Sequence, residues 1–150
     1  MRAYIGLGSN LGDRRGYLDR ALQLLEREPG VKVVAVSEFR ETDPVGYTDQ
    51  PRFLNGAAAL ETDFAPSDLL GRLLAVEREL GRERTGPRFG PRTIDLDLLL
   101  FDEKTVDEPG LVVPHPRLAE RRFVLEPLLD LDPELALPDG RRVRDLLEQG

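Results

Sequence analysis

The sequence predicts an α+β fold in which helices cover one face of a largely antiparallel sheet. The first observation is the order of its elements (strand, helix, strand, strand, helix, strand), which is typical of this class. The second is the stretch 93–101, whose apolar and polar residues alternate as in a half-buried strand. The third is a pair of amphipathic helical stretches, each followed by a glycine. At 150 residues, we expect one domain spanning 1–150.

The first half of the chain supplies three of the predicted strands and one helix. Residues 2–8 form a short strand, and Asp13 is the expected N-cap of a helix that stops at Pro29-Gly30. The β-branched residues of 31–39 predict a second strand, and 53–62 predict a third. The segment 40–51 between them contains Pro and Gly and is predicted to be a loop, long enough to suspect a function.

The second half begins with a helix that Pro66 opens and Gly81 ends. A loop over 81–92 and the strand 93–101 follow. The C-terminal part is predicted to hold a hairpin turn and three short helical or apolar segments: 107–110, 117–122, 123–131 and 143–147.

The composition is that of an ordinary globular protein with an acidic surface. Apolar residues make up 40% and charged residues 33%, and the formal net charge is −7 with a pI near 4.8. This balance disfavours broad contact with nucleic acids or anionic membranes, since those partners need a positive surface. The chain has no cysteine, and it has no apolar run of about 18 residues. We therefore expect a cytoplasmic protein without a nucleic-acid or membrane partner. A monomer is also expected, although composition does not determine the oligomeric state.

The charge of segment 82–92 runs against this acidic trend. It carries Arg82, Arg84, Arg88 and Arg92 against one glutamate, a net charge of +3. Guanidinium groups suit phosphate oxygens, because they can bind them through two parallel hydrogen bonds. The density of Gly and Pro predicts a mobile loop. The alternative is a solvated, ion-paired surface loop.

The strand that follows this loop carries two carboxylates on one face. Asp95 and Asp97, with Leu99 and Phe101, are expected to point the same way, the two acids roughly 7 Å apart at about 3.3 Å per residue. The opposite, buried face is expected to consist of four apolar residues: Ile94, Leu96, Leu98 and Leu100.

Two carboxylates on a half-buried strand cost free energy unless a cation accompanies them. Mg²⁺, held by carboxylate oxygens and substrate phosphates, removes that cost. Together with the arginines upstream, Asp95 and Asp97 indicate phosphoryl or nucleotidyl transfer in which the loop closes. An isolated Asp-x-Asp can equally have a structural or surface role.

Four other features give weaker signals. Asn55, beside Phe53 on one strand face, could pair with the edge of a flat heterocycle, or could simply bond to backbone at a strand end. His115, between two prolines, is either a donor to phosphate oxygens or a turn residue. Glu77 is most simply a solvated helix residue, although its place near the loop leaves a ligand role open. The glycine-rich turn within 6–12 lacks the lysine of a phosphate loop and is predicted to be a tight strand-to-helix turn.

Five motifs occur along nearly the whole chain: AYIGLGSNLGD at 3–13, FLN at 53–55, GPRTIDLDLLLF at 90–101, VPHPR at 113–117 and RRFVLEPL at 121–128. In order and spacing they resemble the 6-hydroxymethyl-7,8-dihydropterin pyrophosphokinase family of folate biosynthesis. The resemblance implies a ferredoxin-like α+β sandwich. It also implies transfer of the β,γ-pyrophosphoryl group of ATP to the hydroxymethyl oxygen of the pterin, leaving AMP, with two Mg²⁺ ions as cofactors.

The resemblance also implies roles for individual residues. Asp95 and Asp97 would bind the two Mg²⁺ ions, and Arg82 and Arg92 would close on the phosphates as catalytic residues. The residues expected around ATP are Glu77, Arg84, Leu98, His115 and Arg121. The residues expected around the pterin are Thr42, Pro44, Val45, Gly46, Phe53, Asn55, Phe89 and Phe123. Phe89 stands where well-known relatives have Trp, so stacking without an indole hydrogen bond is expected there.

Two other classes of function compete with this interpretation. A two-metal nucleotidyl transferase or cyclase would also set carboxylates on such a sheet, but it would release pyrophosphate. A ferredoxin-like ligand sensor or RNA-binding module would not turn substrate over. RNA binding calls for exposed aromatic residues in a basic surface, whereas here aromatic residues are 6% of an acidic chain.

Overall fold

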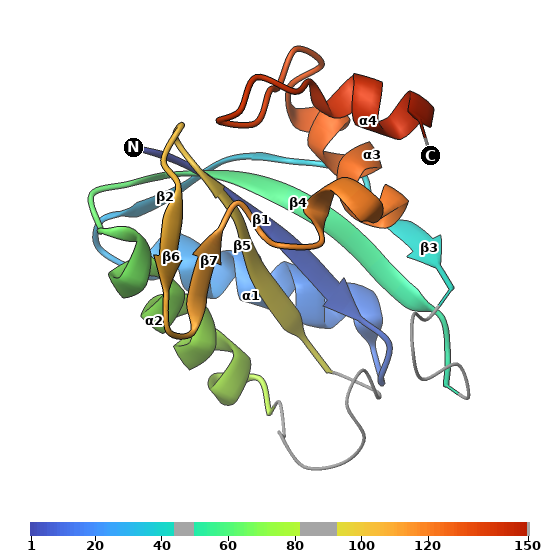
Figure 1. The fold of residues 1–150 in the computed structure, drawn as a ribbon. Helices are drawn as coiled ribbons and strands as arrows, with labels where there is room; N and C mark the ends of the chain where they lie inside the picture. Colours follow the sequence, from blue (N-terminus) through green and yellow to red (C-terminus); the bar gives the residue numbers. More distant parts are fainter. Residues whose placement is uncertain (44–49, 82–92, 150) are drawn as a thin grey trace.

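A five-stranded sheet organises the computed structural model, which describes residues 1–43, 50–81 and 93–149 (Figure 1). Its strand order is β2-β4-β1-β5, with β3 also pairing with β4, and every pairing is antiparallel. The strands are β1 (Arg2–Ser9), β2 (Val31–Val36), β3 (Arg40–Thr42), β4 (Phe53–Thr62) and β5 (Asp95–Phe101). With the helices between them, this is the ferredoxin-like order that the resemblance implied.

The two long helices, α1 (Arg14–Arg27) and α2 (Pro66–Glu79), lie on one face of the sheet, as expected (Figure 1). Asp13 caps α1, because its side chain accepts a hydrogen bond from Gly16 N at 3.1 Å. Pro66 stands in the first turn of α2, where its missing N–H costs nothing. Gly81 follows α2 with a φ of +85°, a conformation that favours glycine. The apolar stripes of both helices pack on inward-facing residues of β1, β4 and β5.

The C-terminal part adds a second apolar layer that the sequence interpretation lacked. Helices α3 (Arg122–Leu131) and α4 (Val143–Gln149) pack on the opposite face of the sheet, over the end distant from the start of β5 (Figure 1). The physical reason is that this face also carries apolar side chains there: Tyr4, Ala57, Ala59, Leu99 and Leu100. Helices therefore cover part of the face expected to be free of them, and only its other end is left for a site.

A β-bulge in β5 supplies part of this second apolar patch. Tyr4 pairs with Leu100 and the next residue of β1, Ile5, pairs with Leu98, so Leu99 is the extra residue. Beyond the bulge the faces exchange: Phe101 lies in the core beneath α1 and α2, and Leu100 joins Leu99 on the opposite face. The strict alternation predicted for 93–101 is therefore wrong at its last two residues, although it holds for the two acids.

The remaining elements are short. A hairpin of β6 (Val106–Glu108) and β7 (Leu111–Val113) turns as predicted, and a 3₁₀ turn spans Leu118–Glu120. The segment predicted to be a loop over 40–51 begins with β3, a short strand that pairs with the start of β4. Within the described residues, the model contains no helix with the length and apolarity needed to cross a membrane.

Candidate active site

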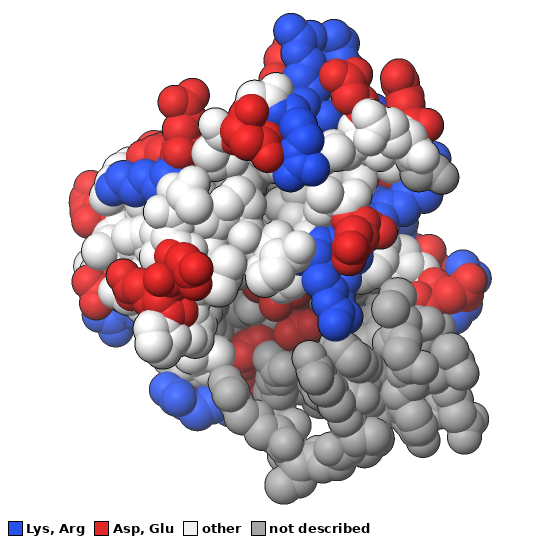
Figure 2. All heavy atoms as spheres, viewed as in Figure 1, with Lys and Arg blue, Asp and Glu red and all other residues white. Residues whose placement is uncertain are grey.

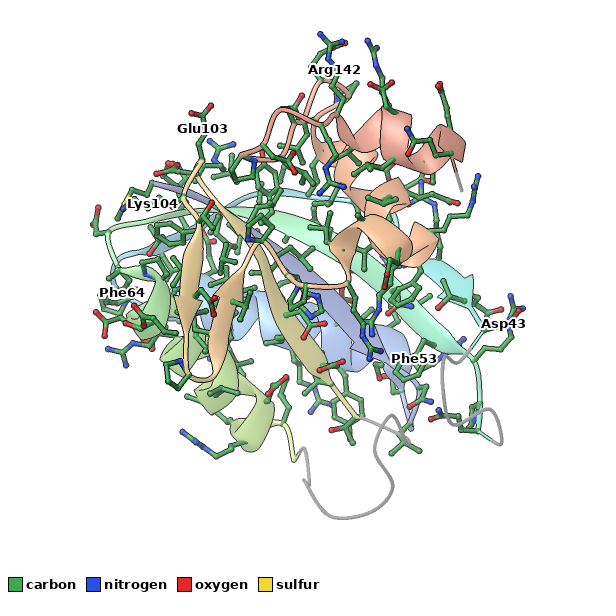
Figure 3. The ribbon with its side chains drawn as sticks, viewed as in Figure 1. Asp43, Phe53, Phe64, Glu103, Lys104 and Arg142 are labelled. Carbon is green, nitrogen blue, oxygen red and sulfur yellow. The ribbon has the colours of Figure 1, made fainter. Side chains whose placement is uncertain are left out.

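The antiparallel pairing brings three strand ends together at one edge of the sheet. Gly8, near the end of β1, lies opposite Asn55 on one side and Asp95 on the other. Because neighbouring strands lie about 4.8 Å apart, Asn55 and Asp95 are separated by roughly 10 Å across the glycine. Phe53 lies at this end of β4, whereas Glu103 follows the far end of β5 (Figure 3). These residues lie on the sheet face opposite the one that α1 and α2 cover.

Two glycines of β1 form a floor without side chains between these residues. Gly6 pairs with Asp97, and Gly8 pairs with Asp95. A Cβ atom at Gly8 would collide with the side-chain oxygen of Asn55 and would approach the Phe53 ring to 3.6 Å. The Asn55 side chain thus occupies the space that any larger residue at position 8 would fill.

Asn55 is held by a neighbour from the short strand β3. It is 9% exposed, and its amide nitrogen donates a hydrogen bond to the hydroxyl of Thr42. Thr42 in turn lies opposite Phe53 in the β3–β4 pairing. The amide is therefore fixed by a side chain rather than by backbone. Thr42, Phe53 and Asn55, three residues expected around the pterin, lie together.

Asp95 and Asp97 are both half-buried and share the face of the two glycines. Figure 2 shows acidic side chains inside a hollow at this face, beside residues that are not described. Among residues 1–43, 50–81 and 93–149, no cluster of three or more His, Asp or Glu side chains forms a complete metal site. Two carboxylates suit Mg²⁺, which usually takes one or two protein carboxylates and fills its remaining positions with water and substrate phosphates.

His115 lies near these acids on the segment after β7. Its backbone N donates to Leu99 O at 3.0 Å, and its Nδ1 accepts from Arg117 N at 3.2 Å. Nδ1 is thus an acceptor, which leaves Nε2 to carry the proton of the neutral ring. Burial lowers the pKa of His115, the positive charges of Arg121 and Arg117 lower it further, and Asp95 opposes them by raising it. The Arg121 guanidinium also lies 5.5 Å from the centre of the Phe123 ring.

Two residues expected around ATP have buried side chains, Glu77 against the expectation of a solvated residue and Leu98 on the strand face that was expected to be buried. Glu77 is not solvated: it is 1% exposed, and its Oε2 accepts a hydrogen bond from Leu96 N at 2.8 Å. The Leu98 side chain is 4% exposed and packs in the core with α1 and α2. Any contact of Leu98 with a nucleotide must therefore come from its backbone.

Other expected residues lie outside the described part of the chain: Pro44, Val45, Gly46, Arg82, Arg84, Phe89 and Arg92.

Sequence reasoning missed two residues of this region. Gly8 was assigned only to a strand end and the tight turn that follows it, although it makes room for Asn55. Asn10 is 2% exposed, and its Nδ2 donates to Gln50 Oε1 at 2.8 Å and Pro51 O at 3.0 Å. These hydrogen bonds connect the turn after β1 to the residues just before β4. An Asn within the glycine-rich turn was the available signal, but its partner is 40 residues away in the sequence.

Comparisons with known proteins match this chain to one enzyme family. The family model for 7,8-dihydro-6-hydroxymethylpterin-pyrophosphokinase matches residues 4–133. The chain is 53% identical, over 97% of its own length and 90% of the relative, to the 2-amino-4-hydroxy-6-hydroxymethyldihydropteridine pyrophosphokinase of Pseudomonas aeruginosa. It is 51% identical to the Bacillus subtilis protein of that name, over 86% of this chain and 77% of the relative.

The fold is also similar to solved structures. A Plasmodium falciparum HPPK-DHPS triple mutant, solved with pteroate, matches 99% of this chain with a TM-score of 0.77 and 17% identity. This chain spans 43% of that longer protein, so the likeness concerns the fold alone. The extent of the family match and the identity to whole relatives establish that this chain belongs to the 7,8-dihydro-6-hydroxymethylpterin-pyrophosphokinase family.

Proposed function

We propose that this chain transfers the β,γ-pyrophosphoryl group of ATP to 6-hydroxymethyl-7,8-dihydropterin, as a step of folate biosynthesis. The hydroxymethyl oxygen attacks the β-phosphorus and loses its proton, while the bond from that phosphorus to the oxygen bridging the α-phosphate breaks. The products are the pterin diphosphate and AMP. Membership in the pyrophosphokinase family supports this reaction.

The observation that supports this reaction best is that Gly8 lies between the amide and aromatic side chains of Asn55 and Phe53 on one side and the carboxylates of β5 on the other. The Asn55 amide and the Phe53 ring are suited to the edge and face of a pterin. Asp95 and Asp97, across the glycine floor, are suited to the ions that accompany a triphosphate. A pterin hydrogen-bonded to Asn55 would extend its hydroxymethyl group over Gly8 toward the phosphates.

The side chains around the acids would act mainly by holding charge and position. Asp95 and Asp97 would each give a carboxylate oxygen to one or both of two Mg²⁺ ions. When bound, these ions would neutralise charge on the phosphate oxygens and polarise the attacking alcohol. His115 would donate from Nε2 to a phosphate oxygen, consistent with the acceptor role of its Nδ1. Arg121 and Phe123 would present their stacked side chains to the ligands.

The roles proposed for the arginines of segment 82–92 come from the sequence alone. Arg82 and Arg92 would close on the triphosphate and stabilise the charge that develops on the AMP side. Phe89 would stack without an indole hydrogen bond. The chain would act in the cytoplasm as a monomer.

Product analysis tests the reaction. The purified protein, with ATP, MgCl₂ and 6-hydroxymethyl-7,8-dihydropterin, should form AMP and the pterin diphosphate in equal amounts. Release of pyrophosphate would instead identify a nucleotidyl transferase or cyclase. Ligand binding with no product would identify a sensor. Asp97→Ala should abolish product formation, whereas Glu103→Ala, at the far exposed end of β5, should leave it unchanged (Figure 3).

A further inference from the structure

A buried carboxylate joins helix α2 to the strand that carries the two acids. Glu77, in the last turn of α2, is 1% exposed. Its Oε2 accepts a hydrogen bond from the backbone N–H of Leu96 at 2.8 Å, and this bond is itself buried. Leu96 stands between Asp95 and Asp97, so Glu77 fixes the peptide group that links Asp95 to Leu96.

The hydrogen bond between Leu96 and Glu77 lies on the side of β5 that has no partner strand in the described sheet. In the described sheet β5 is an edge strand, paired only with β1, so the N–H of Leu96 that reaches Glu77 is not used in that pairing. Since successive side chains of a strand alternate, the orientation of this peptide group sets how both neighbouring carboxylates project. The same bond holds the end of α2 against the start of β5, the two described elements that flank segment 82–92.

The position of Glu77 is unfavourable for a negative charge. A buried ionised group is costly even when hydrogen-bonded. The last turn of a helix disfavours negative charge, because its free carbonyls already make that end negative. The bond to Leu96, which stands between the two acids, places this carboxylate beside the proposed metal-binding pair and points to a role in the site.

We infer that Glu77 is a positioning residue for the metal-binding pair: it orients Asp95 and Asp97 through the Leu96 peptide group. The effect of Glu77 on turnover that this inference predicts rests on the proposed function. The inferred role differs from the role around ATP that the family resemblance implied, because Glu77 acts here through the strand. Charge-assisted hydrogen bonds of this kind are stronger than neutral ones, which suits the carboxylate to holding the N–H of a strand that has only one partner strand in the described sheet.

Two neutral substitutions separate the hydrogen bond from the charge. Glu77→Gln keeps an acceptor oxygen at the same reach, and Glu77→Met keeps the volume but removes the acceptor. Both remove one negative charge, so the difference between them reports hydrogen bonding by this side chain, and the exchange of the Leu96 amide shows whether the bond to Leu96 is lost. Glu79→Gln is the matched control, because Glu79 is an exposed glutamate of the same helix end.

Three measurements are made on each variant. Amide hydrogen exchange of Leu96, followed by NMR in metal-free protein, reports the bond itself. The affinity for Mn²⁺ with a non-hydrolysable ATP analogue, followed by the paramagnetic signal of free Mn²⁺, reports the carboxylate pair. AMP formation against Mg²⁺ concentration reports the reaction. All are made below the thermal midpoint of the least stable variant.

We expect Glu77→Met to lose the protection of the Leu96 amide and to bind Mn²⁺ about 10–100-fold more weakly than Glu77→Gln, the scale for removing a partner that orients a metal ligand. Its Mg²⁺ requirement for AMP formation should rise in the same proportion. Glu79→Gln should match the unmodified protein in all three measurements.

Equal Mn²⁺ affinities in the Gln and Met variants, with Leu96 protection lost only in Met, would overturn the inference, since the bond would then be purely structural. Loss of Mn²⁺ affinity in Gln as severe as in Met, with Leu96 still protected, would also overturn it, because the carboxylate would then act on the ion directly. If the unmodified protein bound Mn²⁺ and the ATP analogue but formed no AMP, the proposed function would fail, and the comparison of Mn²⁺ affinities would still decide the role of Glu77.

Discussion

The side chain of Asn55 lies directly over Gly8 of the neighbouring strand, in the space that a Cβ atom at position 8 would need. Asn55 also donates to Thr42, so it is held from two sides. The glycine is therefore part of the proposed pterin pocket, although it brings no side chain to it. Its backbone simultaneously pairs with the strand of the two acids. This relationship links the two halves of the site through one residue.

Gly8→Ala should weaken pterin binding by about 10-fold or more, because the methyl group displaces a buried amide from its hydrogen bond, a loss of about 1–3 kcal/mol. Affinity for an ATP analogue should change much less. The measurement is calorimetric titration with the pterin, with and without the analogue. Gly71→Ala is the control: its Cβ meets nothing within 4 Å, and alanine has a higher helix propensity than glycine at this exposed position of α2.

A double-mutant cycle makes this prediction more specific. In an Asn55→Ala background the added methyl at position 8 meets no amide, so Gly8→Ala should cost little further affinity. Additive losses in the two backgrounds would show that Gly8 acts by another route.

The imidazole of His115 should be neutral at pH 7. Burial and the neighbouring Arg121 lower its pKa from the ordinary value of 6.5, so the folded protein binds this proton less readily than the unfolded chain. The free energy of unfolding should consequently decrease as the pH falls below 6.5, until the folded pKa is also passed. NMR titration of the ring in ligand-free protein gives the pKa directly.

His115→Gln should remove this decrease from urea unfolding curves measured at successive pH values. The decrease caused by His115 begins at pH 6.5, whereas the pKa of Asp130 is lowered from 3.8 and its contribution is lost only below that value. An imidazole that titrates above 6.5 would contradict the assignment of a neutral donor.

Arg40 connects β3 to α3 by an ion pair with Asp130 that includes one hydrogen bond, from Nη2 to Oδ1. Its Nη1 and Nη2 lie 2.8 and 2.9 Å from the two carboxylate oxygens of Asp130, and both side chains are about 30% exposed. The hydrogen bond from Arg40 lowers the pKa of Asp130, so this contribution to stability is present above pH 3.8 and is lost as the pH falls through the folded pKa. Asp130→Asn should lower the free energy of unfolding by about 1 kcal/mol near neutral pH.

Denaturant unfolding at neutral pH measures this loss, and Arg40→Ala should not add to it fully, because the two residues share one interaction. The exposed pair of Arg15 and Asp19 is the comparison, and Asp19→Asn should cost only a few tenths of a kcal/mol. Equal losses at Asp130 and Asp19 would contradict a special role for the β3–α3 connection.

Local patterns predicted most of the fold. The N-cap at Asp13, the opening of α2 at Pro66, its end near Gly81 and the bounds of β4 all follow from residue type and spacing. The bulge at Leu99 could not be predicted, since an alternating sequence carries no mark of an extra residue in the pairing. The second helical layer was missed because the apolar residues that it covers come from three strands distant in the sequence, and the bulge brings Leu100 to them against the predicted alternation.

The candidate site was predictable in its residue types but not in its connections. Asp95 and Asp97 were identified from their period of two, and Asn55 from its poor fit to a strand. The contact between Asn55 and Gly8 and the bond between Glu77 and Leu96 each join residues distant in the sequence. Local propensity carries no information on such distant pairs. Glu77 stands one position beyond the apolar stripe of its helix, and this local pattern predicts a solvated side chain.

The most direct test is a crystal structure of the protein with Mg²⁺, a non-hydrolysable ATP analogue and 6-hydroxymethyl-7,8-dihydropterin. We predict carboxylate oxygens of both Asp95 and Asp97 about 2.0–2.1 Å from Mg²⁺ ions that also bind the triphosphate. The pterin should lie against Asn55, with its hydroxymethyl oxygen facing the β-phosphorus. Carboxylates turned away from the ions, or a hydroxymethyl group facing the α-phosphorus, would contradict the account.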